Sequence, residues 1–378
     1  MPVCFEAAAL TPTFVLITSL ATTVVCAALL LNSRLRKLFA DSADKPQALH
    51  SEVTPRLGGV AIIFGVLAAT IAPILSNVRT PVSFLLLISL TLAVVSVLDD
   101  LFELSAAIRL MWHAFSSVML LLGLANFYLP SEGLIALAVL PQAFGLLIIV
   151  IGLVWMINLY NFMDGANGLA GFMGLIGFCA LAIAVNASPI RTSETQNLVM
   201  LCLSVSGACG GFLFFNFPRA RLFMGDAGSV FLGSLAGGTA VVGCVLKLWQ
   251  WWFVPLVFSP FIVDASFTLL KRIFKREKIW LPHRQHIYQR LIVVCRWSHS
   301  RTTLMYVVMM LLASIHALWW QWTSGRSQVN GLEALFPLSI VLPWVVTYAV
   351  LLVAAEWKIR RPPLTKTNMS LKEDQRVR

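Results

Sequence analysis

The sequence predicts an all-α integral membrane protein, and three observations lead to this prediction. Of the 378 residues, 58% are hydrophobic and only 12% are charged, whereas about a quarter of the residues in a soluble domain are charged. Mean hydropathy is +0.83. The apolar residues also form runs close to the roughly 20 residues that a spanning helix needs. We therefore expect one polytopic domain over residues 1–378, with a core at 10–355 and a basic cytoplasmic tail at 356–378.

Eleven apolar runs divide this core, and each predicts one transmembrane helix. The runs fall at 10–32, 57–76, 82–98, 110–128, 139–157, 168–186, 197–216, 230–247, 251–270, 303–323 and 334–355. The N-terminus lacks the basic stretch of a cleaved signal peptide, so we expect the first run to be a retained span.

The placement of Lys and Arg predicts the orientation in the membrane. With eleven spans the connectors alternate between two sides, and 24 of the 28 Lys and Arg residues fall on one of them. The positive-inside rule makes that side cytoplasmic, so the N-terminus is periplasmic and the C-terminus cytoplasmic. The net charge of +11 thus reflects topology, not nucleic-acid binding. Trp residues at 249–252 and 319–322 would then form an aromatic belt at the outer interface.

Two adjacent carboxylates, Asp99 and Asp100, end the third run in the stretch SVLDDLFELS. The C-terminal end of a helix disfavours anions, so this pair needs a compensating cation. A solvated helix end, a metal ligand and a proton acceptor all fit, because paired acids raise the pKa of one member.

The stretch NLYNFMDGANGLAG at 158–171 follows the fifth run directly. Asn161 and Asp164 share one face if the helix continues, and the glycines allow a backbone or phosphate to approach closely. An ordinary helix end and turn is the alternative.

GDAGS at 225–229 precedes the eighth run. Gly225 and Asp226 would lie at a helix N-terminus, where free N–H groups favour an anion. Asp226 could equally be a simple N-cap.

Two histidines, His283 and His286, have helical i, i+3 spacing in a loop rich in Lys and Arg. No third zinc ligand is evident, so a phosphate-rich ligand suits the loop better than zinc. Asp264 lies about two turns inside the ninth run, where acids are usually paired or functional. It is either a structural partner of Lys271 or Arg272, or part of the site.

Apart from Asp264, these polar stretches are predicted on the cytoplasmic face. Carboxylate and amide oxygens suit Mg²⁺ or Mn²⁺. The seven Cys residues show no C-x-x-C spacing and are read as small buried apolar residues.

The ordered motifs resemble those of the polyprenyl-phosphate N-acetylhexosamine-1-phosphate transferases of glycosyltransferase family 4, the WecA and MraY superfamily. They are HSEVTPRLGG (50–59), SVLDD (96–100), NLYNFMDGANGLAG (158–171), FFNFPRARLFMGDAGSVFLG (214–233) and HRQHIYQRL (283–291). MraY-type enzymes carry consecutive His residues in the last cytoplasmic loop, whereas this chain has HRQH. The chain therefore looks closer to the WecA/WbpL-like branch.

The resemblance implies a Mg²⁺-dependent transferase of the bacterial inner membrane. It would move N-acetylhexosamine-1-phosphate from a UDP-N-acetylhexosamine to undecaprenyl phosphate, releasing UMP and starting the synthesis of O-antigen or a related envelope glycan. The resemblance allows a homodimer and either a one-step or a two-step route.

The resemblance also implies roles for individual residues. The catalytic set would be Asp99, Asp100 and Asp164, and the metal ligands Asn161 and Asp226. The UDP-sugar would meet His283, Arg284, His286, Asn158 and Gly225.

Two rival functions stay open. One is MraY-type synthesis of the first peptidoglycan lipid intermediate, which HRQH disfavours. The other is a secondary transporter in which acidic residues bind coupling ions. Transporter sites lie near the bilayer midplane, whereas here only Asp264 is predicted to be deep.

Overall fold

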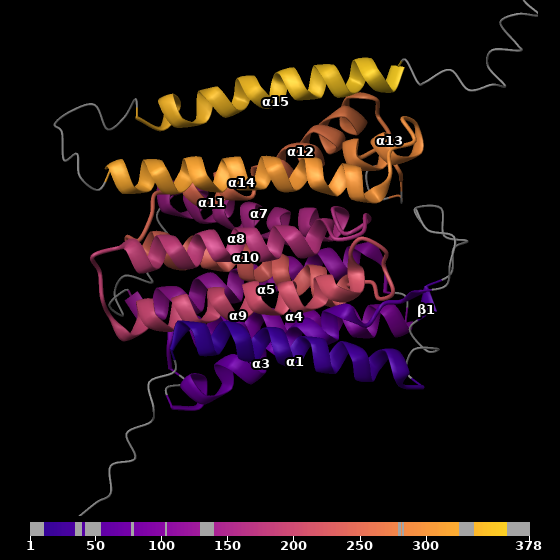
Figure 1. Cartoon of the computed structure of the whole chain (residues 1–378). Coiled ribbons are helices and arrows are strands. Elements are labelled where there is room, and N and C mark those ends of the chain that lie inside the picture. Colours follow the sequence, from indigo (N-terminus) through magenta and orange to yellow (C-terminus); the bar gives the residue numbers. More distant parts are fainter. Residues whose placement is uncertain are drawn as a thin grey trace, which may run out of the picture.

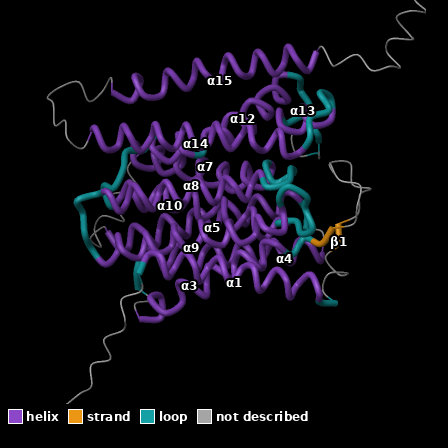
Figure 2. Tube along the Cα trace, in the orientation of Figure 1, coloured by secondary structure: helices purple, strands orange, loops and turns teal. Residues whose placement is uncertain are grey.

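The computed structural model describes residues 11–34, 40–41, 54–76, 79–102, 104–128, 140–278, 281, 283–324 and 336–360. Figure 1 shows a bundle of long helices, with α13, β1 and the C-terminal end of α15 at one end of it. Loops also gather there, beside α13 and near β1 (Figure 2). We call this end the site end.

Helices account for nearly all of the described chain, which confirms the all-α prediction. Their bounds are α1 Pro12–Asn32, α3 Gly58–Ser76, α4 Pro81–Phe102, α5 Ala106–Tyr128, α7 Leu140–Phe162, α8 Leu169–Ala187, α9 Ser193–Asn216, α10 Gly225–Val245, α11 Phe253–Val257, α12 Ser259–Phe274, α13 Ile287–Val293, α14 His299–Ser324 and α15 Phe336–Arg360. Two-residue strands β1 (Ala40–Asp41) and β2 (Thr54–Pro55) pair antiparallel.

Within the described residues, each predicted apolar run lies mostly in helix, and local signals explain several boundaries. Thr192 and Thr195 form a capping box before α9, which satisfies amides that the first turn leaves free. The run at 251–270 is divided, since α11 ends at Val257 and α12 begins at Ser259 with Pro260 in its first turn. Proline has no N–H to continue the ladder, so the first turn is a favourable place for it.

Eight of the described helices are long and apolar enough to cross a membrane: α1, α4, α5, α7, α8, α9, α10 and α14. In α3 and α15 the described side chains form the shorter apolar stretches Gly58–Ile71 and Leu342–Trp357. The count of eleven spans and the orientation therefore stay predictions, and residues 361–378 of the basic tail lie outside the described part.

The central helix α10 positions the site, because α3, α4 and α7 all pack against it. α8, α9 and α10 are the most buried of the spanning helices, while α1, α5 and α7 leave most of their surface outside the bundle. α10 starts at the end where α4 and α7 finish, as the contacts below show. An antiparallel arrangement thus brings three helix ends together.

The predicted aromatic belt is wrong for two of its residues. Trp249 and Trp252 are buried, and the Trp249 indole donates to the Ala240 carbonyl at 3.2 Å. Trp251, Trp319 and Trp322 are exposed, as a belt requires. Adjacent positions in a tight connector point in different directions, so spacing alone did not separate the two groups.

Candidate active site

A salt bridge joins the end of α4 to the start of α5. Arg109 Nη1 donates to Asp99 Oδ2 at 2.9 Å, and Asp99 is buried. Asp99 lies in the last turn of α4, where the helix dipole disfavours an anion. Arg109 is the compensating cation that the sequence required. Asp100 lies beside it, half-buried.

The same guanidinium faces the start of α10. Arg109 Nη1 is 3.8 Å from Asp226 Oδ2, and its side chain is 41% exposed. Arg109 therefore bridges two carboxylates from different helices and keeps part of its donor surface accessible. Its planar fork of N–H groups suits a phosphate as well as a carboxylate.

Gly225 and Asp226 begin α10, which confirms the predicted helix N-terminus. The N-cap is Met224, so the alternative in which Asp226 is an N-cap is wrong. Gly225 has φ +72°, and a Cβ there would lie 2.9 Å from the Arg56 carbonyl. A side chain would be strained in this backbone conformation.

Residues 55–59 run alongside this helix start. Phe223 N donates to the Pro55 carbonyl at 2.9 Å, and Gly58 N and Gly59 N donate to the carbonyls of Phe223 and Met224. This backbone ladder fixes the position of Asp226 relative to α3.

Asp164 lies in the turn after α7, which ends at Phe162. The helix does not continue, so Asn161 and Asp164 do not share a helical face, and Asp164 N bonds the Asn161 carbonyl at 3.1 Å. Both side chains are half-buried. The Gly225 backbone donates to Asp164, which places this turn against the start of α10.

Hydrogen bonds to residues far away in the sequence hold the turn that follows α7. Asn216 Oδ1 accepts from Gly168 N at 2.6 Å, and Asn167 Nδ2 donates to the Pro218 carbonyl at 3.1 Å. Thr303 Oγ1 of α14 donates to the Asn167 carbonyl at 2.7 Å. The turn is thus a built wall of the site.

Burial raises the pKa of Asp164 well above that of a free aspartate, and the neighbouring Asp226 carboxylate raises it further. Arg56 and the Gly225 amide oppose this shift. Two nearby carboxylates in a partly desolvated site favour either a proton or a cation between them.

Asn158 and His113 extend the site along α7 and α5. Asn158 Nδ2 lies 3.2 Å from His113 Nδ1 and donates to the Val154 carbonyl at 2.7 Å. His113 is buried one turn beyond Arg109. The Asn158 amide is therefore held in a fixed orientation, facing the same helix that carries Arg109.

The histidines lie in a loop before a helix, as the sequence predicted. His286 is the N-cap of α13, which starts at Ile287. The rings of His283 and His286 lie 5.0 Å apart. Arg284 is exposed, His283 half-buried and His286 buried.

Asp264 has different partners from those the sequence suggested. Lys271 pairs with Glu356 at 2.5 Å, and Arg272 pairs with Glu277 at 3.5 Å. Asp264 instead accepts from the backbone of Ile287 and Tyr288 and from the Tyr306 hydroxyl. A structural partnership with Lys271 or Arg272 is therefore wrong.

The structure gathers Asp99, Asp164, Asp226, Gly225 and Asn158 at the site end. Sequence reasoning missed Arg56, Arg109 and His113 there. Arg109 is the first basic residue after Asp99 in the sequence, and His113 follows Arg109 four residues later. That spacing was the available signal.

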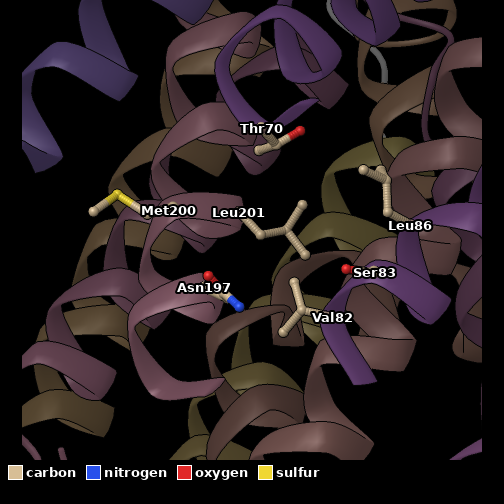
Figure 3. Close-up of a pocket in the computed structure, with 7 residues that line it drawn as sticks. All are labelled: Thr70, Val82, Ser83, Leu86, Asn197, Met200 and Leu201. Carbon is tan, nitrogen blue, oxygen red and sulfur yellow. The ribbon is translucent and has the colours of Figure 1, made fainter. Parts of the chain in front are cut away.

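Two further features bear on metal binding and on cavities in the described residues. Within the described residues, no three His, Cys, Asp or Glu side chains come together as a metal cluster. A cavity of about 10 Å³ lined by Thr70, Ser83 and Asn197 (Figure 3) lies at the opposite end of α4 from Asp99. It has room for about one water and is separate from the site.

Fold and site together define a polytopic helical membrane protein with an arginine-bridged acidic site at one end of its bundle. Residues 82–244 match glycosyl transferase family 4, a range that includes Asp99, Asp164 and Asp226. The phospho-N-acetylmuramoyl-pentapeptide-transferase of Chloroflexus aurantiacus is 30% identical over 258 residues, covering 63% of this chain and 67% of that protein. The chain belongs to glycosyl transferase family 4.

Other relatives are similar over a larger share of the chain. The probable undecaprenyl-phosphate N-acetylglucosaminyl 1-phosphate transferase of Bacillus subtilis is 28% identical over 291 residues, 73% of this chain and 76% of the relative. The decaprenyl-phosphate N-acetylglucosaminephosphotransferase of Mycobacterium leprae is 28% identical over 296 residues, 71% of this chain and 74% of the relative.

Proposed function

We propose that this protein transfers N-acetylhexosamine-1-phosphate from a UDP-sugar to undecaprenyl phosphate. An oxygen of the lipid phosphate forms a bond to the β-phosphorus of the UDP-sugar, and the bond from that phosphorus to UMP breaks. The products are undecaprenyl diphosphate sugar and UMP. The observation that carries this proposal is Arg109, which lies between Asp99 and Asp226 in a family of phospho-sugar transferases.

Arg109 and Asp99 would handle the lipid phosphate. Two anions must meet for this reaction, so their repulsion has to be offset at the moment of attack. The exposed part of the Arg109 guanidinium can bind phosphate oxygens, while Asp99 holds the guanidinium in place. Asp99 can also accept a proton from the lipid phosphate, with Asp100 beside it.

Asp164 and Asp226 would hold a Mg²⁺ ion, with Asn161 next to them; Mn²⁺ is the alternative. Mg²⁺ is usually bound by one or two carboxylates together with substrate phosphates, without a full protein cage. A pair of neighbouring carboxylates, one with a raised pKa, fits this pattern although no three-residue cluster is present among the described residues. When bound, the ion supplies positive charge that stabilises the phosphoryl oxygens in the transition state.

The last loop would bind the sugar nucleotide. Arg284 is exposed and His283 half-buried, so both can reach the diphosphate. His286 is buried beside Asp264, a position that favours supporting the loop over direct contact. Asn158 and Gly225, which lie near Asp164 and Asp226, complete the set of residues that we propose to bind the UDP-sugar.

UDP-N-acetylglucosamine is the donor we favour, because the Bacillus and Mycobacterium relatives are named for N-acetylglucosamine. The Chloroflexus relative, named for N-acetylmuramoyl-pentapeptide, favours the second candidate. The HRQH sequence in place of consecutive histidines argues against that substrate. The reaction would start an O-antigen or related envelope glycan at the cytoplasmic face of a bacterial inner membrane.

UMP release tests the proposal. Purified protein is incubated with undecaprenyl phosphate, Mg²⁺ and, in separate reactions, UDP-N-acetylglucosamine, other UDP-N-acetylhexosamines and UDP-N-acetylmuramoyl-pentapeptide. We expect UMP that depends on both lipid and Mg²⁺, with UDP-N-acetylglucosamine used best. Preferential use of the pentapeptide donor would establish the second candidate. UMP from no donor, by protein that is folded in detergent, would refute the proposal.

A further inference from the structure

Asp264 is a buried acid that the proposed reaction does not use. It lies in α12 and is 3% exposed. An acid in such a place is costly unless its oxygens are satisfied, and acids inside membrane proteins are usually functional. Its contacts show which part of the molecule it controls.

The Asp264 carboxylate holds the first residues of α13. Oδ1 accepts from Ile287 N at 2.8 Å, and Oδ2 accepts from Tyr288 N at 3.1 Å. Tyr306 of α14 donates its hydroxyl to Oδ2 at 2.5 Å. Thr268 Oγ1 of α12 also donates to Oδ1 at 3.3 Å. Because donors from α13 and α14 converge on one carboxylate of α12, the backbone at 287–288 has a defined position relative to α12 and α14.

This anchored backbone directly follows the histidine loop, which we define as residues 283–286. His286 Nδ1 is 3.5 Å from Asp264 Oδ1, and the His286 ring stacks on Tyr288 at 5.9 Å. The exposed Arg284 is therefore three residues from a fixed point in the fold. A shift of Ile287 and Tyr288 would move the loop with them.

Tyr288 also connects α13 to the end of α7, next to the turn that bears Asp164. Its hydroxyl donates to the Phe162 carbonyl at 3.0 Å, one of the carbonyls that the end of α7 leaves without a helical partner. A Cβ on Gly165 would lie only 2.2 Å from this hydroxyl. Tyr288 thus lies against the turn that bears Asp164.

We propose that Asp264 is a positioning residue that sets the spacing between the histidine loop and the Asp164 turn. It acts through the backbone of Ile287 and Tyr288 and through the Tyr288 hydroxyl bond to α7. This inference rests on the proposed function, in which the loop binds the sugar nucleotide and the turn holds the cation. Within that function, this spacing would govern how the two sides hold the diphosphate of the UDP-sugar.

Two variants break the link at different points. Asp264→Asn keeps the size of the side chain but places an NH₂ group where one oxygen accepted from N–H or O–H donors. Tyr288→Phe removes only the hydroxyl that reaches Phe162. Glu356→Gln is the matched control, because Glu356 binds Arg290 of α13 and Lys271 of α12 away from the Asp164 turn.

Steady-state kinetics give the first readout. We expect Asp264→Asn and Tyr288→Phe to raise the KM for UDP-N-acetylglucosamine at least tenfold, while the KM for undecaprenyl phosphate changes less than twofold. Glu356→Gln should change neither KM more than twofold. A fall in kcat alone, or equal rises of both KM values, would overturn the proposal.

Hydrogen–deuterium exchange gives a second readout that does not need turnover. Peptides that contain Ile287 and Tyr288 should exchange faster in Asp264→Asn than in wild type, whereas Tyr288→Phe should keep these amides protected. Unchanged exchange in Asp264→Asn would overturn the proposal. If wild type releases no UMP from any donor, the proposed function fails by itself, and the exchange result still decides whether Asp264 holds the loop.

Discussion

Arg109 Nη1 donates a 2.9 Å hydrogen bond to Asp99 Oδ2, which joins the ends of two consecutive helices at the mouth of the site. The same nitrogen is 3.8 Å from Asp226. A single cation therefore links the α4 and α10 carboxylates, and 41% of its side chain stays exposed.

Replacing Arg109 should separate charge from geometry. Arg109→Gln removes the cation and should lower kcat/KM at least 100-fold, equivalent to ~2.7 kcal/mol of transition-state stabilisation. Arg109→Lys keeps the charge but loses the planar fork, so we expect an intermediate activity. UMP release over a range of donor concentrations gives kcat/KM for both variants. Wild-type activity in Arg109→Lys would show that the fork is not used, and equal losses in the two variants would show that the positive charge alone contributes nothing.

Asp226→Asn should abolish turnover while the protein stays folded in membranes. Asp226 is a partly exposed side chain at a helix start, so it serves the site rather than the core. The measurement is UMP release across a range of Mg²⁺ concentrations, with a thermal midpoint as the folding control. More than about a tenth of wild-type activity, a loss of only ~1.4 kcal/mol, would refute the metal assignment.

His283→Ala should weaken use of the UDP-sugar more than use of the lipid. A larger rise in the KM for the lipid than in the KM for the UDP-sugar would assign the histidine loop to lipid binding. Burial, followed by His286 and Arg272, lowers the pKa of His283 to about 4, against a smaller opposing effect of Glu277. The ring is therefore neutral in the folded protein above pH 6.

The pH dependence follows from this shift. An unfolded histidine titrates near 6.5, so between about pH 6.5 and 4 the unfolded state binds more protons than the folded state. His283 should therefore reduce stability as the pH falls through that window and contribute no pH dependence above it. Thermal midpoints of wild type and His283→Gln should be parallel from pH 7 to 8, and wild type should fall more steeply below 6.5. Parallel curves throughout would contradict the low pKa.

Gly165→Ala should destabilise the protein, because the new Cβ would lie 2.2 Å from the Tyr288 hydroxyl. Overpacking of this kind costs typically 1–3 kcal/mol. In the double variant with Tyr288→Phe the nearest ring atom is at 3.1 Å, so part of the stability should return. Thermal midpoints of both single variants and the double variant give the coupling. Additive losses would show that the two residues do not touch.

The amino-acid sequence by itself determined the helices of this protein and the helix ends that carry its candidate site residues. Each apolar run became helix, because a membrane-length segment must satisfy its backbone hydrogen bonds within itself. Asp99, Asp164 and Asp226 were predictable as residues at or beside helix ends, since polar residues interrupt or border the runs. Family motifs then supplied their expected roles.

Only the tertiary structure decided which of these residues meet. Arg109 pairs with Asp99 and Asp226. Asp264 accepts hydrogen bonds from the backbone of Ile287 and Tyr288 and does not pair with Lys271 or Arg272. The sequence placed His283 and His286 in a loop, and only the structure shows that His286 is the N-cap of α13. Such contacts depend on the rotation and depth of helices packed against one another. Local periodicity records which face of a helix is apolar, but it carries no record of the residue opposite.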